Sequence, residues 1–447
     1  MNKYNFILFS LIFLACPKID PPDDKKDIVL TQSSLSLSLE SQWTTSLKIK
    51  ATVRDTADTF TFELLRDDST IGIYTIENTP RDTILTDGPL TPSTEYQYHA
   101  FVLDGDIRTE YSDTLSAMTM DTTSHNFTWE IDTLGEYGSY LKDVWIVNEN
   151  DIWAVGALSI PDSDGYVPSY ANYNAAHWDG EEWEMMKIHS GAELNAIHYF
   201  SEDDIWVCSG FPKHWDGNEW TMYHLHNMGF DGVSINTMWG TSSSNMYFVG
   251  LNGSIVHYDG SEFVKMESGT DVELIDIDGT EDGEHIFVTG FTNVDFWGNV
   301  LLEYSNSIWN ILYESDHYLS NAEDYGAVLN VNVKSDTVYA TMMGGLWKYN
   351  YIEKTSVYVH ENKYNKGAYF HTTHIKALET NDIFLVSTRW NTAHYNGITW
   401  NYDNSVNQYW GNGNVWSQSA DYNGDLFVVV GYVGNRLTAL VTRGLKN

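Results

Sequence analysis

A short unit that is found four times constrains the fold more than any other feature of this sequence. Its fullest form is His214 to Trp220, HWDGNEW, and related segments begin at His177, His257 and His394. In each copy, Asp-Gly or Asn-Gly provides residues that tolerate positive φ in a tight turn, and aromatic residues flank that turn. A weaker copy, Glu303 to Trp309, keeps the aromatics but loses the glycine. The unit therefore predicts a β-hairpin that is repeated along the chain.

A second pattern, a polar residue followed by an aliphatic and an aromatic one, precedes the hairpins, as in Asp204-Ile205-Trp206. Its seven copies are spaced by 40 to 53 residues. Seven units at this spacing predict an all-β fold, a seven-bladed β-propeller with about four strands per blade over residues 127–447. Short, β-branched and aromatic apolar runs, interrupted by Gly, Asn and Asp, argue against helices. The aromatic residues of the pattern are Trp153, Trp206, Tyr247, Phe287, Tyr339, Phe384 and Phe427.

The two ends of this region complement each other. Residues 127–131 contain Trp129 in the context of a hairpin return strand, but no hairpin precedes it. The seventh unit, at the C-terminus, has no return strand of its own. We therefore expect the strand at 127–131 to complete the seventh blade and to close the ring, which removes exposed sheet edges.

The N-terminal residues predict export and lipidation. Residues 1–16 have one charged residue, Lys3, then an apolar run too short to span a membrane, and end in Phe13-Leu14-Ala15-Cys16. This resembles a bacterial lipobox, with Phe13 where Leu is usual, and implies that Cys16 carries the lipid; an ordinary signal peptide or an uncleaved anchor is the alternative. The proline-rich, charged residues 17–27 then read as a solvated tether. The expected location is the outer membrane, facing either the periplasm or the cell surface.

Residues 28–121 predict a separate β-sandwich. Polar and apolar residues alternate in 47–53 and 59–65, as in strands with one buried face. The segment Leu90 to Tyr96, LTPSTEY, resembles the L-x-P-x-T-x-Y signature of fibronectin type III domains, which implies a tyrosine-corner role for Tyr96. The sequence departs from that family because its usual second-strand tryptophan is missing. We expect a spacer here, followed by a short polar joint at 122–126.

The ligand site is expected on one face of the propeller. The loops from second to third strand and from blade to blade leave one face, and they hold nearly all the long insertions. Long loops on a rigid scaffold are where binding residues concentrate. Their aromatic, Asn, Asp and His residues suit a glycan or a polypeptide, although such rings can also simply pack the loops. The candidates are Tyr166, Tyr170, Tyr173, Trp297, Tyr318, Trp390, Tyr409 and Trp410.

Charge and motifs narrow the function. A net charge of -38 makes nucleic acid an improbable partner. No G-x-S-x-G, H-E-x-x-H or Gly-rich phosphate loop is present, and the three arginines of a sialidase clamp are not distributed over the blades. The sequence predicts a monomeric binding module without a catalytic residue. The alternative is a carbohydrate-active enzyme that uses carboxylates of the same loops, such as Asp295, Asp316 or Glu323.

Metal binding is not part of the main interpretation. The pairs Asp162/Asp164 and Asp276/Asp278 leave a calcium ion open as a possibility, and no other cofactor is expected. The four hairpin histidines occupy one repeat position, which favours a repeated packing or hydrogen-bonding role between blades over a shared metal. Cys208, which follows Trp206 on a strand, reads as a buried small apolar residue.

The succession of D-I-W-A-V-G at 151–156 and H-W-D-G-x-x-W at 177–183 resembles bacterial surface propellers of the sialidase-repeat and photosystem-assembly-factor-like group. The resemblance covers about 127–447 and implies the fold, not an activity.

Overall fold

The computed structural model describes residues 31–32, 34–165, 172–189, 192–292, 298–316, 326–343, 345–361, 372–411, 414–434 and 438–447. They form two compact units: the first contains most residues up to Thr119, and the second contains Met120–Asn447 with the short segments Trp43–Thr45 and Thr91–Ser93. Both units are all-β, as predicted. Among the described residues, the helices are η1 (Leu225–Met228), η2 (Leu251–Gly253) and α1 (Ser405–Tyr409), none long and apolar enough to cross a membrane. The predicted signal peptide, Cys16 and the tether lie outside these residues.

The first unit is a sandwich of two sheets whose neighbouring strands are antiparallel, apart from one parallel pair. Leu47, Ile49, Ala51 and Val53 alternate with more exposed residues, as the sequence predicted, and pack with Phe62 of the other sheet. One sheet has the order β1-β8-β7-β4-β5 with β9 on β7, and the other has the order β2-β3-β6. The strands are β1 (Thr31–Gln32), β2 (Leu35–Gln42), β3 (Leu47–Val53), β4 (Thr59–Arg66), β5 (Ser69–Glu77), β6 (Arg81–Asp87), β7 (Glu95–Asp104), β8 (Ile107–Tyr111) and β9 (Leu115–Met118).

Two tyrosines of β7 have distinct surroundings. Arg66 lies over the ring of Tyr96 at 5.5 Å, and the tyrosine-corner role of Tyr96 stays a prediction. The fully buried Tyr98 donates a hydrogen bond to Asp87 Oδ2 at 2.6 Å, and Arg66 pairs with the same carboxylate at 2.9 Å. This buried network ties β4, β6 and β7 together across the two sheets.

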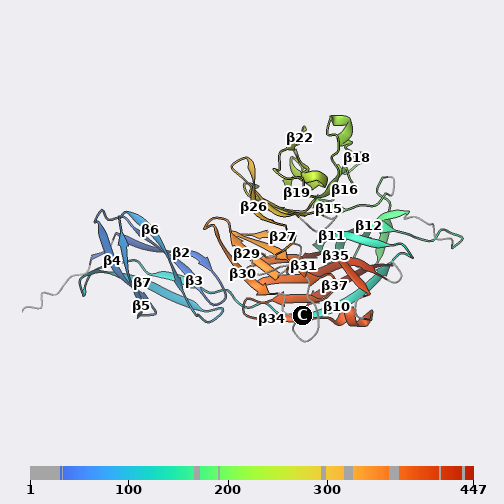
Figure 1. Cartoon of the computed structure of the whole chain (residues 1–447). Coiled ribbons are helices and arrows are strands. Elements are labelled where there is room, and N and C mark those ends of the chain that lie inside the picture. Colours follow the sequence, from blue (N-terminus) through green and yellow to red (C-terminus); the bar gives the residue numbers. More distant parts are fainter. Residues whose placement is uncertain are drawn as a thin grey trace, which may run out of the picture. The chain divides into compact units, whose positions relative to one another are not determined.

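The second unit consists of seven four-stranded sheets (Figure 1). We call them blades 1 to 7 and their strands a to d, from the innermost to the outermost. The strands of blades 1 to 3 are β11 (Tyr140–Asn148), β12 (Asp151–Leu158), β13 (Tyr173–Trp178) and β14 (Trp183–Met186); β15 (Ala196–Ser201), β16 (Asp204–Cys208), β17 (Pro212–Trp215) and β18 (Trp220–Met222); β19 (Ile235–Ser242), β20 (Asn245–Gly250), β21 (Ile255–Tyr258) and β22 (Phe263–Met266).

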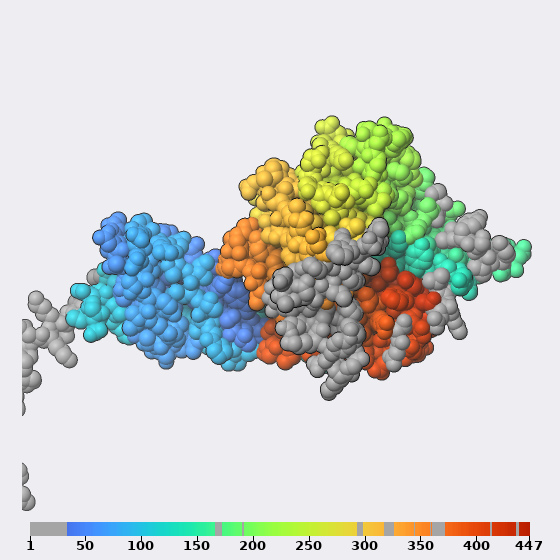
Figure 2. All heavy atoms as spheres, in the orientation of Figure 1, coloured from blue at the N-terminus to red at the C-terminus, as the bar shows by residue number. Residues whose placement is uncertain are grey.

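Blades 4 to 6 follow the same order, and blade 7 uses both ends of the unit. Their strands are β23 (Leu274–Gly279), β24 (Ile286–Phe291), β25 (Asn299–Ser305) and β26 (Ile308–Ser315); β27 (Val328–Lys334), β28 (Thr337–Met342), β29 (Gly345–Asn350) and β30 (Thr355–Glu361); β31 (Thr372–Glu379), β32 (Asp382–Ser387), β33 (Thr392–Tyr395) and β34 (Trp400–Asp403); β35 (Val415–Tyr422), β36 (Leu426–Val433), β37 (Thr438–Lys446) and β10 (Phe127–Leu134). Side chains fill the spaces between the ribbons of neighbouring blades (Figure 2).

Strand β10 closes the ring, as predicted for residues 127–131. It pairs antiparallel with β37 from Phe127 opposite Lys446 to Leu134 opposite Ala439. Figure 1 shows this cyan strand beside the red C-terminal strand. Two outer-strand tryptophans add ties to the neighbouring blades: Trp129 Nε1 donates to Asp403 of blade 6, and Trp183 Nε1 of blade 1 donates to Asp132, both at 3.1 Å. Blade 7 is therefore held by residues far apart in the sequence.

The hairpins form the turns that the repeat predicts, and the glycine and the preceding acidic residue have different roles in each turn. The glycine takes positive φ, for example 84° at Gly217 and 97° at Gly180. The preceding acid caps the turn: Asp216 Oδ1 accepts the backbone N–H groups of Asn218 and Glu219 at 2.9 and 2.8 Å. Those bonds hold the pKa of Asp216 below its usual value.

The repeated histidine stacks on the repeated aromatic of strand b. The ring centroids lie 4.3 Å apart for Trp206 and His214 and 4.4 Å apart for Phe384 and His394. The Nε2 atom of each histidine contacts the polar residue that begins strand b of the same blade. The prediction of a role between blades was therefore wrong about the hydrogen-bond partner, which lies in the same blade. The pairs are His177 with Asp151, His214 with Asp204, His257 with Asn245 and His394 with Asp382, each at 2.8 Å.

Three blades depart from this pattern. Blade 4 reverses the residue types, with His285 on the b side and Glu303 on the c side, 3.5 Å apart. Blade 5 places the Lys348 amine over the Tyr339 ring at 4.8 Å. In blade 7, Phe427 packs toward blade 6, onto Phe384, whereas the other six aromatics face the following blade. The seventh copy of the sequence pattern is therefore one residue out of phase with the rest.

The predicted polar joint is part of the propeller unit. Thr123 Oγ1 donates to the backbone oxygen of Asn381 at 3.2 Å. His125 Nδ1 lies 2.9 Å from His394 Nδ1, and His125 Nε2 lies 3.2 Å from Thr399 Oγ1. These contacts fix residues 123–125 on blade 6 immediately before β10 begins.

Candidate functional site

The strand bounds confirm the division of loops between two faces. The a–b connections of blades 1 to 3 and the c–d hairpins are short, whereas the b–c connection of blade 1 runs from 159 to 172 and the link from blade 6 to blade 7 from 404 to 414. We call the face that carries the b–c and blade-to-blade connections the loop face.

Half of the predicted ligand residues lie outside the described residues: Tyr166, Tyr170, Trp297 and Tyr318. Of the others, Tyr173 begins β13 half-buried against the core shared by blades 1 and 7. Trp390 is only 1 % exposed, and its Nε1 donates to Thr442 Oγ1 at 3.0 Å. Its φ of 60° turns the ring into the core between blades 6 and 7, so the prediction of a surface contact was wrong for Trp390.

The remaining two candidates belong to a larger aromatic group. Tyr409, at the end of α1, is 72 % exposed and lies edge-on to Trp410 with 5.2 Å between centroids. Asn414 Nδ2 donates a hydrogen bond to the Trp410 backbone oxygen. The backbone oxygen of Asn414 accepts the N–H of Gly434, and Gly434 lies next to the Trp416 ring. Trp416 is 38 % exposed.

The group continues from blade 7 to blade 1. Trp416 on β35 pairs directly with Tyr432 on β36, and Tyr432 meets Tyr140 of β11 with 6.4 Å between centroids. We call Tyr409, Trp410, Trp416, Tyr432 and Tyr140 the aromatic arc. Sequence reasoning missed the last three because they lie on strands, at or next to the strand end, rather than in loops.

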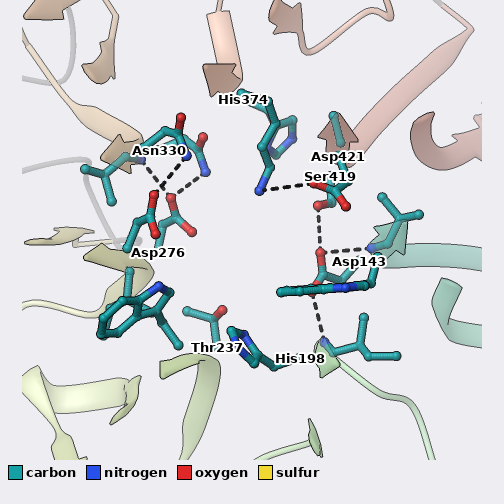
Figure 3. Close-up of a pocket in the computed structure, with 18 of the residues that line it drawn as sticks. Asp143, His198, Thr237, Asp276, Asn330, His374, Ser419 and Asp421 are labelled. Atoms are coloured by element: carbon teal, nitrogen blue, oxygen red, sulfur yellow. Dashed lines mark hydrogen bonds and ion pairs between the residues drawn. The ribbon is translucent and has the colours of Figure 1, made fainter. Parts of the chain in front are cut away.

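Below this face, the seven inner strands enclose a channel with a cavity of about 200 Å³ (Figure 3). It is lined by Trp145 and Trp239 together with polar residues from the inner strands of all seven blades. The polar side chains are Asp143, His198, Thr237, Asp276, Asp278, Asn330, Asn332, His374, Lys376, Ser419 and Asp421.

Most of these polar groups bind the backbone of the next blade. Asp143 Oδ2 accepts the N–H of Ile197 at 2.9 Å, Asp276 Oδ2 that of Val331 at 2.7 Å, and Asn330 Oδ1 that of Ile375 at 2.9 Å. Asp421 Oδ2 accepts the N–H of Ile146 at 2.8 Å and joins blade 7 to blade 1. Further ties are Asp278 to Val333, Asn332 to Ala377, and Asn236 Nδ2 to the Leu274 oxygen. We call these bonds the inner ties.

Lys376 is the cation of the channel. Its side chain is 39 % exposed, and Nζ lies 3.8 Å from Asp421 Oδ1. Burial opposes the charged amine, but Asp421, Asp278, Asp276 and Asp143 outweigh it and raise the pKa of Lys376. Burial, with Asp278 nearby, raises the pKa of Asp276 to about 7. Burial lowers the pKa values of His198 and His374 to about 4, so both imidazoles are neutral at pH 7.

The geometry does not favour the suggested calcium sites. Asp276 and Asp278 already accept backbone N–H groups of blade 5, and Asp162 Oδ1 accepts the N–H of Asp164 at 3.0 Å. Among the residues that the structure describes, no group of three or more His, Cys, Asp or Glu is arranged to hold a metal ion. The channel carboxylates thus act on the protein itself.

The chain is a β-propeller by its architecture, and comparison with solved structures agrees. It is similar to "YCF48 bound to D1 peptide", with a TM-score of 0.53 and 13 % identity over 73 % of this chain and 98 % of that chain. It is also similar to the extracellular domain of the putative hybrid two-component system BT3049 from B. thetaiotaomicron, with a TM-score of 0.50 and 10 % identity over 72 % of this chain and 42 % of that one. Compared by sequence, the chain matches no family model and no curated protein. At such identities the likeness shows the fold alone.

Proposed function

We propose that the propeller is a binding module that takes a polypeptide on its loop face, along the aromatic arc. The observation that carries this proposal is the arc itself, in which exposed rings of Tyr409 and Trp416 are set on short, tied strands and turns. Tyr and Trp give large contact areas at low entropic cost and dominate protein interfaces. The similar YCF48 structure holds a D1 peptide, which supports a polypeptide as the class of ligand.

A glycan is the second candidate ligand. It is favoured by the ring of Tyr409, which is 72 % exposed on the same turn as Asn404 and Gln408. Aromatic faces can stack on the apolar faces of sugars, and amides can bond hydroxyl groups. The enzyme alternative has less support, since Asp295 and Glu323 lie outside the described residues and Asp316 is an exposed residue directly after β26.

One binding experiment separates these ligands. The purified full-length chain is screened against a random peptide library and against a glycan array, and the best binder of each is titrated. Changing Tyr409 or Trp416 to Ala should weaken binding at least about tenfold, which corresponds to roughly 1.4 kcal/mol. The matched control is Tyr402→Ala, a 49 % exposed tyrosine on the outer strand β34. Binding that survives both arc variants would refute the proposal, and the array that gives the arc-dependent binder identifies the ligand class.

We also propose that the propeller is presented at the outer membrane by a lipid on Cys16, with a fibronectin-like sandwich as spacer. Support comes from the lipobox-like residues 13–16 and the charged tether that follows. Palmitate labelling of the chain in a bacterial host should be lost in Cys16→Ser. Labelling retained in that variant would exclude this anchor.

A further inference from the structure

Blade 2 contains a lysine where the repeat demands an apolar residue. Lys213 lies on β17, directly before the repeated His214, and is 2 % exposed. At the same position, the other blades that keep the repeat phase bury apolar side chains. These are Ala176, Val256, Leu302, Trp347 and Ala393 of blades 1, 3, 4, 5 and 6.

Lys213 also lacks the charge partners that a buried cation normally has. Arg443, the comparable buried cation of blade 7, contacts Glu130 at 2.9 Å and Asp132 at 3.1 Å. Lys213 forms no such ion pair within the described part of the chain, and its amine instead meets the Ser209 hydroxyl. Burying an unpaired ammonium is costly, so the amine is held toward its neutral form. Burial accordingly lowers the pKa of Lys213.

The partner, Ser209, lies on the loop face. It follows β16 in the tight b–c turn of blade 2, where Gly210 has φ of 78°, and it is half-buried rather than enclosed. Lys213 Nζ lies 2.5 Å from Ser209 Oγ. A hydroxyl within hydrogen-bond reach of a neutral amine is the arrangement of an activated nucleophile and its base.

The neighbouring thiol does not compete for this role. Cys208 is fully buried, and its Sγ donates toward the Asn236 backbone oxygen at 3.5 Å. Burial raises the pKa of this thiol to about 12, so it stays protonated at neutral pH. Ser209 is therefore the one of the two adjacent nucleophiles that has both a base and access to solvent.

We propose that Ser209 and Lys213 form a nucleophile–base pair that accepts acyl groups from small activated esters at the loop face. The Lys213 amine takes the Ser209 proton while Oγ bonds to the ester carbonyl carbon. The carbon–oxygen bond to the leaving alcohol then breaks, and the alcohol receives that proton from Lys213. The products are an acylated Ser209, a neutral Lys213 and the free alcohol, without any oxidant or metal.

The test uses the full-length chain with a fluorophosphonate probe and with p-nitrophenyl acetate. With the probe, the Ser209 oxygen bonds to phosphorus, fluoride leaves, and Lys213 takes up the proton. We expect one label per chain at Ser209 by peptide mass spectrometry, and a burst of one nitrophenol per chain. The labelling rate should rise with pH through a midpoint below the ordinary lysine pKa of about 10.4.

Four variants decide the assignment. Ser209→Ala should abolish the label, and Lys213→Met should slow it by about 100-fold, in line with loss of general-base assistance. Lys213→Met places an apolar side chain where five blades already have one, so its melting curve should show an intact fold. Ser261→Ala and Lys265→Met alter an exposed turn serine and an exposed lysine of blade 3, and should leave the rate unchanged.

The outcomes separate cleanly. A label at another serine, or a rate in Lys213→Met within about twofold of the unaltered chain, overturns the proposal, because general-base loss should be far larger. If Lys213→Met fails to fold, the pH profile of the unaltered chain decides: a rate with no midpoint below 10 excludes Lys213 as the base.

Discussion

The inner and outer strands of the propeller hold the ring together in different ways. At the inner strands, polar side chains of one blade bind the backbone of the next, as Asp143 does with Ile197 and Asp421 with Ile146. At the outer strands, the tryptophan ties are found on both sides of blade 7, at Trp129 and Trp183. The inner ties are thus distributed around the channel, whereas these two outer ties flank blade 7, to which both ends of the propeller unit contribute strands.

Blades 4 and 5 sharpen this comparison within the inner layer. Asp276 and Asp278 of blade 4 accept backbone N–H groups at 2.7 Å, and Asn330 and Asn332 of blade 5 do so at 2.9 and 2.8 Å. In these two blades the tie uses a side-chain oxygen at the same position, whether or not that side chain is charged. Charge at the inner ties therefore sets the electrostatics of the channel, and Lys376 is the group that offsets it.

The largest effect is expected at the seam. Deleting residues 122–133 removes most of β10, including Trp129. It leaves in place the inner tie of Asp421 and the hydrogen bond that Ser419 Oγ donates to Asp143 Oδ1. The open edge of β37 should then promote aggregation, as exposed edge strands do. Size-exclusion chromatography and thermal melting measure this. A monomer with an unchanged melting temperature would show that inner ties alone close the ring.

The outer His–Asp pairs should differ according to burial. In blade 6, His394 and Asp382 are both 4 % exposed, and Tyr422 also bonds Asp382 at 2.9 Å. In blade 2, His214 and Asp204 are 20 % and 30 % exposed. His394→Ala should cost about 3 kcal/mol because it leaves a buried carboxylate short of a partner. His214→Ala should cost about 1 kcal/mol, since water can replace the imidazole. Chemical denaturation gives both values, and equal losses would contradict the burial argument.

Removing the channel cation should have a smaller effect. Lys376→Met leaves Asp143, Asp276, Asp278 and Asp421 without their nearby positive charge. Because the lysine side chain is 39 % exposed, screening limits the expected loss to about 2 kcal/mol at pH 8. The exposed Lys265→Met serves as the control. A loss that persists unchanged at pH 5, where carboxylates are more protonated, would point to lost packing instead of charge.

The repeats and the closing strand could be predicted from the sequence because they depend on local rules. Asp-Gly turns, alternating apolar residues and an unmatched strand at each end of the unit are visible without any long-range contact. The inner ties were not predicted, because Asp276 and Asn330 look like ordinary polar residues of alternating strands until the next blade is placed beside them. Phe427 was correctly assigned to strand b of the seventh blade. That its ring faces blade 6 instead of the following blade depends on the register of β35 and β36, which the sequence pattern does not show.

The candidate site was predicted less completely than the fold. The loop face follows from loop lengths, and Tyr409 and Trp410 lie on it. Trp390 was misplaced because a left-handed backbone at a non-glycine residue has no clear sequence signal and here turns the ring inward. Trp416, Tyr432 and Tyr140 were missed because strand ends join the site only when blades 7 and 1 meet through β10.

The smallest effect is expected when the charged inner tie of blade 4 is replaced by the neutral amide that blade 5 has. This exchange is also the sharpest test of the comparison within the inner layer. Asp276→Asn keeps a side-chain oxygen for the Val331 N–H and removes the charge. The folded pKa of Asp276, about 7, lies above its unfolded value near 3.9, so the folded state binds the extra proton between these limits. Stability from this group is thus fully present below about pH 4 and is lost as pH rises through 7.

The variant should gain about 1 kcal/mol at pH 8 and almost nothing at pH 4, after allowance for screening by channel water. Denaturation at both pH values measures the difference, with Asn330→Asp as the reverse exchange, which should lose stability only at the higher pH. A pH-independent change in Asp276→Asn would mean that the tie depends on the carboxylate geometry and not on its charge.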